Sequence, residues 1–505
     1  MRSTTPSSII LLALCAIPAL SAPIQHTLAP RTENSLNWTD CSAYPWLRSK
    51  DLQCGNITVP VDWAAPSGET FTLRMVRLPR PANATRPRVG SLFINPGGPG
   101  GSGVTAVANI ASGFEPVSEE ILHSFDLIGV DPRGVQQSVE SICDSAIWAE
   151  RVSLFPKTQE EYDRLVDKNR RLGESCRAQM GSVVDHLDTI SAARDHEAVR
   201  AALGEDMNWL GISYGSMLGA QYAQLFPGKI RTMVFDGVLQ HSRSEWDNAR
   251  IETTAYAASL RKFFDWAETN DESALKGRDV EKFWYELLAK ARQTPIQNPW
   301  CNYTNIPPQF RDCREDVNEE DILFNTQGLL LTTRQQNRVF LAEALVKASQ
   351  GNADDFASSL PMSFNPSLFA GITIGCQDWA PTDSSFEDLQ AKMRMVEEAA
   401  SLTKGASQTW TLQASCIGWP NAPKNPPAKL NIKTQDPILL VNSLRDPSTS
   451  YEWAVGMQDE IEKSVLLTRN GDGHTSWSLS GATRVAIDHY LITEELPAPG
   501  TVLDS

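Results

Sequence analysis

A serine flanked by two glycines is the feature that most constrains what this chain can fold into. Residues 211–215 read GISYG. The apolar run at residues 207–210 predicts a strand before this segment, and residues 217–223 predict a helix after it. Glycines at this spacing permit a sharp turn from strand to helix that exposes a side chain. We therefore expect Ser213 to be a nucleophile and not part of an ordinary glycine-serine loop.

The segments around Ser213 alternate between helical and strand patterns. Residues 189–203 predict a helix before the turn, and residues 230–238 predict the next strand after it. Further strands are predicted at residues 57–63, 71–78, 91–95, 125–130, 437–442 and 464–467. This order predicts an α/β fold with a mostly parallel, doubly wound sheet flanked by helices.

The sheet pattern is interrupted in the second half of the chain. Residues 242–291 and 319–350 are helical in pattern, and a proline-rich connection precedes the strand at 437. At 505 residues the chain is long for a single sheet domain. We expect one core, built from residues 23–240 and 431–505, with a large helical cap at 241–430 inserted between two core strands.

The first 22 residues have the pattern of a secretory signal peptide. Arg2 is the only charge before an apolar run at residues 9–19, and Ser21 and Ala22 offer a cleavage site. No later run reaches the roughly 18 apolar residues of a membrane span. We expect a secreted, extracellular protein that does not bind membrane.

The cysteines also favour an oxidising compartment. Removing Cys15 of the signal peptide from the nine cysteines leaves an even number. The remaining cysteines form local couples, and we expect a disulfide in each: Cys41-Cys54, Cys143-Cys176, Cys301-Cys313 and Cys376-Cys416. No C-x-x-C or H-x-x-x-H spacing supports the alternative of a metal site, so we expect no metal.

Acidic composition and glycosylation sequons agree with secretion. The formal net charge of −16 repels nucleic acid and anionic membrane surfaces. Nucleic acid is therefore excluded as a partner. N-glycosylation sequons begin at Asn37, Asn56, Asn83 and Asn302.

The turn at Ser213 is similar to the nucleophile turn of α/β-hydrolases. In that fold the catalytic residues follow the chain order Ser, then Asp or Glu, then His. The carboxylate fixes the tautomer of the imidazole, which takes the proton of the serine. Asp446 follows the strand at 437–442, and His474 lies in a glycine-rich turn after the next strand. We expect Ser213, Asp446 and His474 to form a triad.

Two other residues compete for these roles. His241 lies at the start of the cap and is the alternative histidine. Asp472 is the alternative acid, but it is only two residues from His474 and is more suited to shaping the turn.

The oxyanion of the tetrahedral intermediate needs backbone N–H donors. One is expected from Tyr214, the residue after the nucleophile, and one from the glycine-rich loop at residues 95–103. Gly98 is our choice in that loop, with Gly97 and Gly100 as alternatives. The loop lacks the Lys-Ser/Thr ending of a phosphate-binding loop, so we expect no nucleotide or other cofactor.

Several motifs occur together in a family-like order: NPGGPG at 95–100, DPRG at 131–134, ARD at 193–195, GISYG at 211–215, GCQDW at 375–379, CIGWP at 416–420, Asp446-Pro447 and Gly473-His474. With them the chain resembles the secreted tripeptidyl aminopeptidases related to proline iminopeptidase, including their TAP-like C-terminal region. The resemblance implies an α/β-hydrolase fold, no metal, and hydrolysis of short peptides from a free amino terminus. One departure is Gln136-Gln137, where the family usually has a further glycine.

An aminopeptidase must bind the ammonium group of its substrate with carboxylates, and these should come from the cap. Asp378 is one candidate by resemblance, and Glu245 near the start of the cap is another. The same triad also serves ester and lactone hydrolases, so a small-molecule ester remains the alternative substrate to a short peptide. A non-catalytic binding protein would tolerate losses in the triad or the oxyanion loop, and no such loss occurs.

Overall fold

The computed structural model describes residues 36–42, 44, 46–47, 49–301, 313–332, 334–357, 366–379, 381 and 385–504. The expected signal peptide and Asn302 lie outside these residues.

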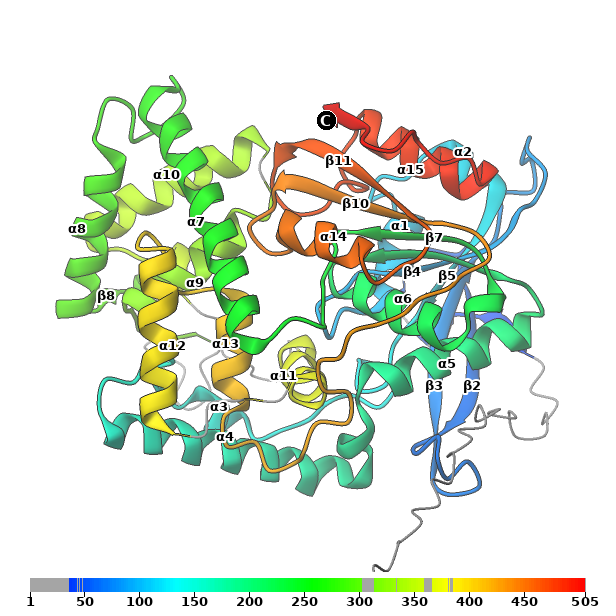
Figure 1. Cartoon of the computed structure of the whole chain (residues 1–505), viewed down its shortest axis with the longest axis horizontal. Helices are drawn as coiled ribbons and strands as arrows, with labels where there is room; N and C mark the ends of the chain where they lie inside the picture. Colours follow the sequence, from blue (N-terminus) through cyan, green and yellow to red (C-terminus); the bar gives the residue numbers. More distant parts are fainter. Residues whose placement is uncertain are drawn as a thin grey trace, which may run out of the picture. The chain divides into compact units, whose positions relative to one another are not determined.

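A ten-stranded sheet forms the core of the fold (Figure 1). Its strand order is β1-β2-β3-β5-β4-β6-β7-β10-β11-β12. The neighbours from β5 through β12 are parallel, whereas β1, β2 and β3 form antiparallel pairs. The strands are β1 (Thr39–Asp40), β2 (Gln53–Pro60), β3 (Thr70–Leu78), β4 (Gly90–Asn95), β5 (Phe125–Val130), β6 (Met207–Ile212), β7 (Ile230–Asp236), β10 (Ile438–Arg445), β11 (Ser464–Asp472) and β12 (Val502–Asp504). The mostly parallel α/β sheet predicted from the sequence is confirmed.

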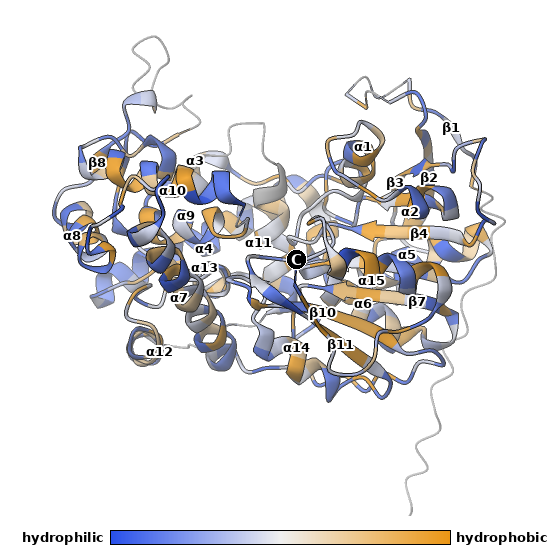
Figure 2. Ribbon diagram, turned by 90° about the horizontal axis from the view of Figure 1, so that it is seen from above, coloured by the Kyte–Doolittle hydropathy of each residue, from blue (hydrophilic) through white to orange (hydrophobic). Residues whose placement is uncertain are grey.

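Each face of this sheet carries its own apolar core, because successive side chains of a strand point to opposite faces. Phe93 and Trp209 pack on the face covered by α5 (Thr189–Leu203) and α6 (Tyr214–Leu225). Ile94 and Leu210 pack on the face covered by α1 (Gly103–Ala111) and α15 (Ala482–Thr493). The central strands therefore consist mostly of apolar residues, as their largely orange colour in Figure 2 shows. The helices around the sheet are α1 (Gly103–Ala111), α2 (Glu119–Ser124), α5 (Thr189–Leu203), α6 (Tyr214–Leu225), α14 (Tyr451–Gln458) and α15 (Ala482–Thr493).

A helical segment, called the insertion below, separates β7 from β10 in the sequence, although these two strands are hydrogen-bonded neighbours. Its helices are α7 (Glu245–Thr269), α8 (Val280–Gln293), α9 (Glu319–Leu329), α10 (Gln335–Ser349), α11 (Pro366–Asp378), α12 (Phe386–Ala399) and α13 (Gln408–Cys416). A small sheet of β8 (Ile296–Gln297) and β9 (Asp316–Val317) lies between them in sequence. The insertion has a separate hydrophobic core, which includes Phe264, Trp284 and Leu345. Several of these helices form the left side of Figure 1.

Helix α4 (Gln159–Met180), which precedes the nucleophile in sequence, packs on the insertion. With α3 (Ser145–Ala149) it follows β5 along the chain. The side-chain amide of Asn169 donates to the backbone oxygens of Ala414 and Ile417, at 2.9 Å each. The expected cap at 241–430 does not include α4, because its contacts with α13 are invisible in the local sequence pattern.

Four disulfides join the expected couples of cysteines: Cys41-Cys54, Cys143-Cys176, Cys301-Cys313 and Cys376-Cys416. The sequon residues Asn37, Asn56 and Asn83 are all exposed. None of the helices among the described residues is long and apolar enough to cross a membrane.

Candidate active site

Ser213 occupies the whole turn between β6 and α6, with a backbone φ of 59°. This conformation is strained for a residue with a side chain. The neighbouring glycines explain how it is held: a Cβ on Gly211 would lie 2.2 Å from the oxygen of Gly215, and one on Gly215 would lie 2.7 Å from the oxygen of Asn95. The backbone N–H of Ser213 donates to Asp236 O at 2.8 Å. Only glycines fit on either side of the serine.

Asp446 and His474 lie together at the carboxyl ends of two neighbouring strands. Asp446 follows β10 directly, and His474 lies just past the end of β11. Nδ1 of His474 is 2.8 Å from Oδ2 of Asp446 and 3.0 Å from Oδ1. Because Nδ1 faces the carboxylate, Nε2 is the ring nitrogen left to take a proton from a serine.

The carboxylate of Asp446 is held by a tight turn. It is 1 % exposed and accepts from the backbone N–H groups of Ser448 at 2.8 Å and Thr449 at 2.9 Å. The hydroxyl of Thr449 donates to Oδ2 of Asp446 at 2.8 Å. These donors fix the direction in which the carboxylate faces the imidazole.

Residues 236–237 bring the imidazole to the same side as the serine. Asp236 O accepts from Ser213, and a Cβ on Gly237 would lie 3.1 Å from Cε1 of His474. Burial opposes the charged form of His474, but the charge and hydrogen bond of Asp446 outweigh it, with help from Asp236 and Glu252. The pKa of His474 is therefore raised, which suits a base that must hold a proton during the reaction.

The structure places the two competing residues elsewhere. Asp472 forms ion pairs with Arg338 at 2.7 Å and with Arg445. His241 is buried, and its Nε2 lies 2.7 Å from the backbone oxygen of Asp378. Burial lowers the pKa of His241 to about 4, so this ring stays neutral.

The glycine-rich loop lies against the nucleophile turn. A Cβ on Gly97 would lie 2.3 Å from Ile212 O and 3.1 Å from the N–H nitrogen of Tyr214. The N–H of Gly97 donates to Oδ1 of Asn95 at 3.0 Å. Within the described part of the chain, the N–H of Gly98 makes no hydrogen bond. Tyr214 begins α6, so its N–H has no partner inside the helix. Gly98 and Tyr214 therefore remain the candidate oxyanion donors.

Ser213 lines a cavity of about 630 Å³. Both the core and the insertion contribute to its walls, so the insertion limits access to the serine. The lining residues used below are Glu252 and Asn248 of α7, Gln327 of α9, Gln413 of α13 and Trp453 of α14.

The two carboxylates expected to bind a substrate ammonium group do not line this cavity. Asp378 is fully buried and accepts from Thr189 and Asn425. Burial raises its pKa to about 7. Glu245 forms a buried ion pair with Lys392 of α12. Both carboxylates serve contacts inside the protein.

Glu252, which the sequence did not single out, is the carboxylate in the cavity. It is 1 % exposed and accepts from the side chain of Gln327 at 2.7 Å and from the N–H groups of Gln408 at 3.2 Å and Thr409 at 2.7 Å. Burial raises its pKa to about 7 despite these donors. Its charge contributes to the raised pKa of His474. A negative charge therefore lies in the cavity near the imidazole.

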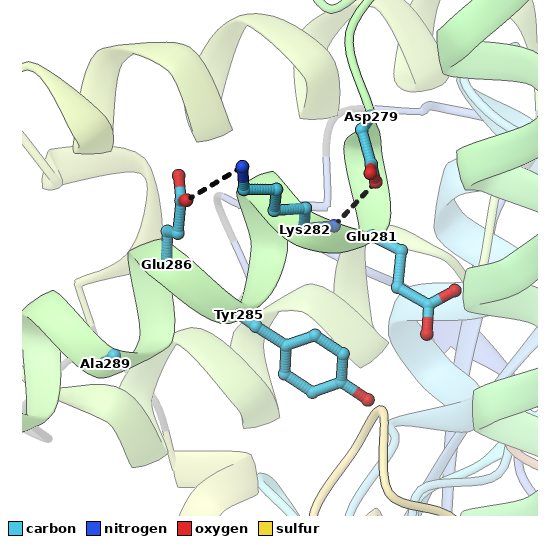
Figure 3. A pocket seen from close by; sticks show the side chains of 6 residues that line it. All are labelled: Asp279, Glu281, Lys282, Tyr285, Glu286 and Ala289. Atoms are coloured by element: carbon cyan, nitrogen blue, oxygen red, sulfur yellow. Dashed lines mark hydrogen bonds and ion pairs between the residues drawn. The ribbon is translucent and has the colours of Figure 1, made fainter.

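A second hollow of about 590 Å³ lies on the surface of α8 (Figure 3). Lys282 lies between Asp279, which accepts its backbone N–H, and Glu286, which is 3.9 Å from its ammonium group. The hollow shares no residue with the Ser213 cavity. Its walls come from one helix and the residue that caps it, Lys282 faces Glu286, and Glu281 pairs with Arg261 outside the hollow, so we assign it no function.

Comparison with known families agrees with this geometry. Residues 90–307 match the family described as alpha/beta hydrolase fold, and residues 401–503 match the one described as TAP-like protein. The chain has the α/β-hydrolase fold, and its carboxy-terminal region matches the TAP-like family. The family resemblance derived from the sequence is thereby confirmed.

Named relatives of this α/β-hydrolase include peptidases and an esterase. It is 29 % identical to a tripeptidyl aminopeptidase of Streptomyces coelicolor over 474 residues, which cover 91 % of this chain and 84 % of the relative. It is 27 % identical to the serine protease Hip1 of Mycobacterium tuberculosis, covering 88 % of this chain and 86 % of that protein. Carboxylesterase B of Mycobacterium tuberculosis is 27 % identical, covering 93 % and 90 % of the two chains.

The insertion of this α/β-hydrolase also holds the loops that carry the candidate acid and base. The side chain of Gln327 donates to Pro447 O at 2.8 Å, next to Asp446. The N–H of His474 donates to Leu331 O at 2.8 Å. The insertion therefore contributes to the position of the candidate triad as well as to the cavity wall.

Proposed function

We propose that this α/β-hydrolase is a secreted serine exopeptidase that cleaves short peptides from a free amino terminus. Ser213 attacks the scissile carbonyl while Nε2 of His474 takes its proton. Asp446 stabilises the resulting imidazolium, and the N–H groups of Gly98 and Tyr214 stabilise the oxyanion. His474 then protonates the leaving amine, and water hydrolyses the acyl-enzyme in a second step of the same kind.

The observation that carries this proposal is the buried carboxylate of Glu252 in the cavity that Ser213 lines. An ionised carboxylate in a partly enclosed site binds a positively charged group strongly, because solvent screens it poorly. The ammonium group of a peptide is such a group, and an uncharged ester is not. The names of two peptidase relatives agree with this choice.

Secretion is supported by separate observations. The amino-terminal sequence has the pattern of a signal peptide, four disulfides join the described cysteines, and three sequon asparagines are exposed. Disulfides persist in oxidising, extracellular compartments.

The decisive experiment compares one tripeptide anilide with a free and with an acetylated amino terminus, using Ser213→Ala as the blank. Cleavage of the free form alone, abolished in the variant, is the expected result. Equal cleavage of both forms would contradict recognition of an ammonium group. The second candidate, ester hydrolysis, is favoured by the relative named carboxylesterase B and would then be tested with acyl esters.

A further inference from the structure

Besides Oε1 of Gln327, whose amide already holds Glu252, three buried polar atoms of residues that line the Ser213 cavity have no hydrogen-bond partner among the described residues. They are Nε1 of Trp453, Oδ1 of Asn248 and Oε1 of Gln413. Each of the three residues is only 3 % exposed. Polar atoms buried in this way are costly unless something pairs with them. The proposed triad, the oxyanion donors and Glu252 use none of them.

The orientation of the two amides is fixed by their nitrogens. The Gln413 nitrogen donates to Glu245 O at 2.9 Å, and the Asn248 nitrogen lies 3.5 Å from Arg243 O. A backbone oxygen can only accept, so turning either amide would place oxygen against oxygen. The amide oxygens are therefore the ends that need a partner.

The unpaired donor and the unpaired acceptors come from elements that pack together. Asn248 and the backbone oxygen that holds Gln413 lie within the first turns of α7. Trp453 lies on α14, whose neighbouring residue Glu452 forms an ion pair with Arg250 of α7 at 3.3 Å. The donor and the acceptors therefore belong to neighbouring elements that line one cavity. We consider one ligand group in that cavity as their shared partner.

The chemistry of the three atoms identifies that group. None of them is charged, and they combine one N–H donor with two carbonyl acceptors. A peptide group, with one carbonyl and one N–H, complements both kinds of atom, whereas an ester offers no donor. We infer that Trp453, Asn248 and Gln413 bind an internal peptide group in the acyl part of the substrate, on the amino-terminal side of the scissile bond.

This inference rests on the proposed peptidase function and deepens it. A substrate with an internal peptide group must carry at least two residues before the scissile bond. The enzyme should therefore release di- or tripeptides in preference to single amino acids. Trp453 and Asn248 would act as specificity-determining residues.

The test compares a tripeptide anilide with depsipeptide analogues, in each of which one internal N–H is replaced by oxygen. The readout is the amide-to-ester ratio of kcat/KM. Wild-type enzyme should prefer the amide about five- to tenfold at one position, since one hydrogen bond is removed. Asn248→Leu should bring that ratio close to one. Trp453→Phe should lower kcat/KM for the tripeptide about five- to tenfold.

Ser259→Ala is the matched control, because it also removes an unpaired buried polar atom from α7 but lies outside the cavity. Its amide-to-ester ratio and its kcat/KM for the tripeptide should equal those of wild type. The rate at which a fluorophosphonate labels Ser213 reports on the reacting centre without any peptide group. Labelling should stay within about twofold in every variant.

The inference alone would be overturned by equal cleavage of amide and depsipeptide by wild type, or by an unchanged amide preference in Asn248→Leu. An effect of Asn248→Leu that appears only with Asn or Gln side chains in the substrate would also overturn it. Failure to cleave any free tripeptide despite normal labelling would instead refute the proposed function, and the subsite with it.

Discussion

Replacing Glu252 by Gln removes the only charge that we assign to substrate recognition. The substitution keeps the size of the side chain and one acceptor oxygen for the donors of Gln327, Gln408 and Thr409. A hydrogen bond between an ammonium group and a carboxylate contributes about 1.5–3 kcal/mol. We therefore expect kcat/KM for a free tripeptide anilide to fall about 10- to 150-fold. For an acetylated substrate or an uncharged ester, kcat/KM should change little.

The pH profile gives a second readout of the same substitution. Because burial raises the pKa of Glu252 to about 7, protonation below that pH should weaken ammonium binding in the wild type. The charge of Glu252 also raises the pKa of His474, so removing it should lower that pKa. The acidic limb of kcat/KM for the free tripeptide should therefore move to lower pH in Glu252→Gln.

Asp378→Asn is the matched control for this experiment. Asp378 is also fully buried with a pKa of about 7, but it does not line the cavity. Its variant should keep the wild-type ratio between free and acetylated substrates, even if the rates change. The reasoning would be refuted if Glu252→Gln lowered kcat/KM equally for free and acetylated substrates. It would also be refuted if only Asp378→Asn lost the preference for the free substrate.

Three further outcomes test the remaining parts of the structure. Asp446→Asn should lower kcat about 10⁴-fold, whereas Asp472→Asn should change it less than about tenfold; single-turnover kinetics will separate the two acids. Gly97→Ala places a Cβ 2.3 Å from Ile212 O and should slow both hydrolysis and fluorophosphonate labelling of Ser213 by at least about tenfold. The raised pKa of Asp378 stabilises the fold at low pH, and this contribution is lost as pH rises through about 7. Urea unfolding should show this loss: between pH 3 and pH 8.5 the free energy of unfolding of wild type, relative to that of Asp378→Asn, should fall by about 4 kcal/mol.

The core and the candidate triad are the parts that local sequence could predict. The strands β4, β5, β6 and β7 are buried on both faces, so each reads as a short apolar run ended by Gly, Pro or a polar residue. Ser213, Asp446 and His474 follow such runs directly, and parallel strands bring their carboxyl ends to one edge of the sheet. Position along the chain therefore favours Asp446 over Asp472 as the acid, and the structure places Asp446 against His474.

The placement of α4 on the insertion could not be read in this way. Its helical pattern predicts one apolar face but does not say which surface covers it. Asn169 of α4 is fixed by Ala414 and Ile417, which lie 245 and 248 residues away in the chain. Contacts of this range depend on the arrangement of whole helices, to which local patterning is blind.

The two carboxylates of α7 show what could not be predicted from the local sequence. Glu245 and Glu252 lie seven residues apart, about two turns along one helix, and both are almost fully buried. What separates them is the partner that each meets: Lys392, 147 residues away, neutralises Glu245, whereas Gln327, 75 residues away, gives Glu252 a neutral donor. An ion pair removes a carboxylate from competition for a substrate cation, but neutral donors leave its charge in place. In the proposed function, the helix that packs against each glutamate decides which of the two carboxylates is left to bind a substrate ammonium group. The substitution Glu252→Gln tests that assignment directly.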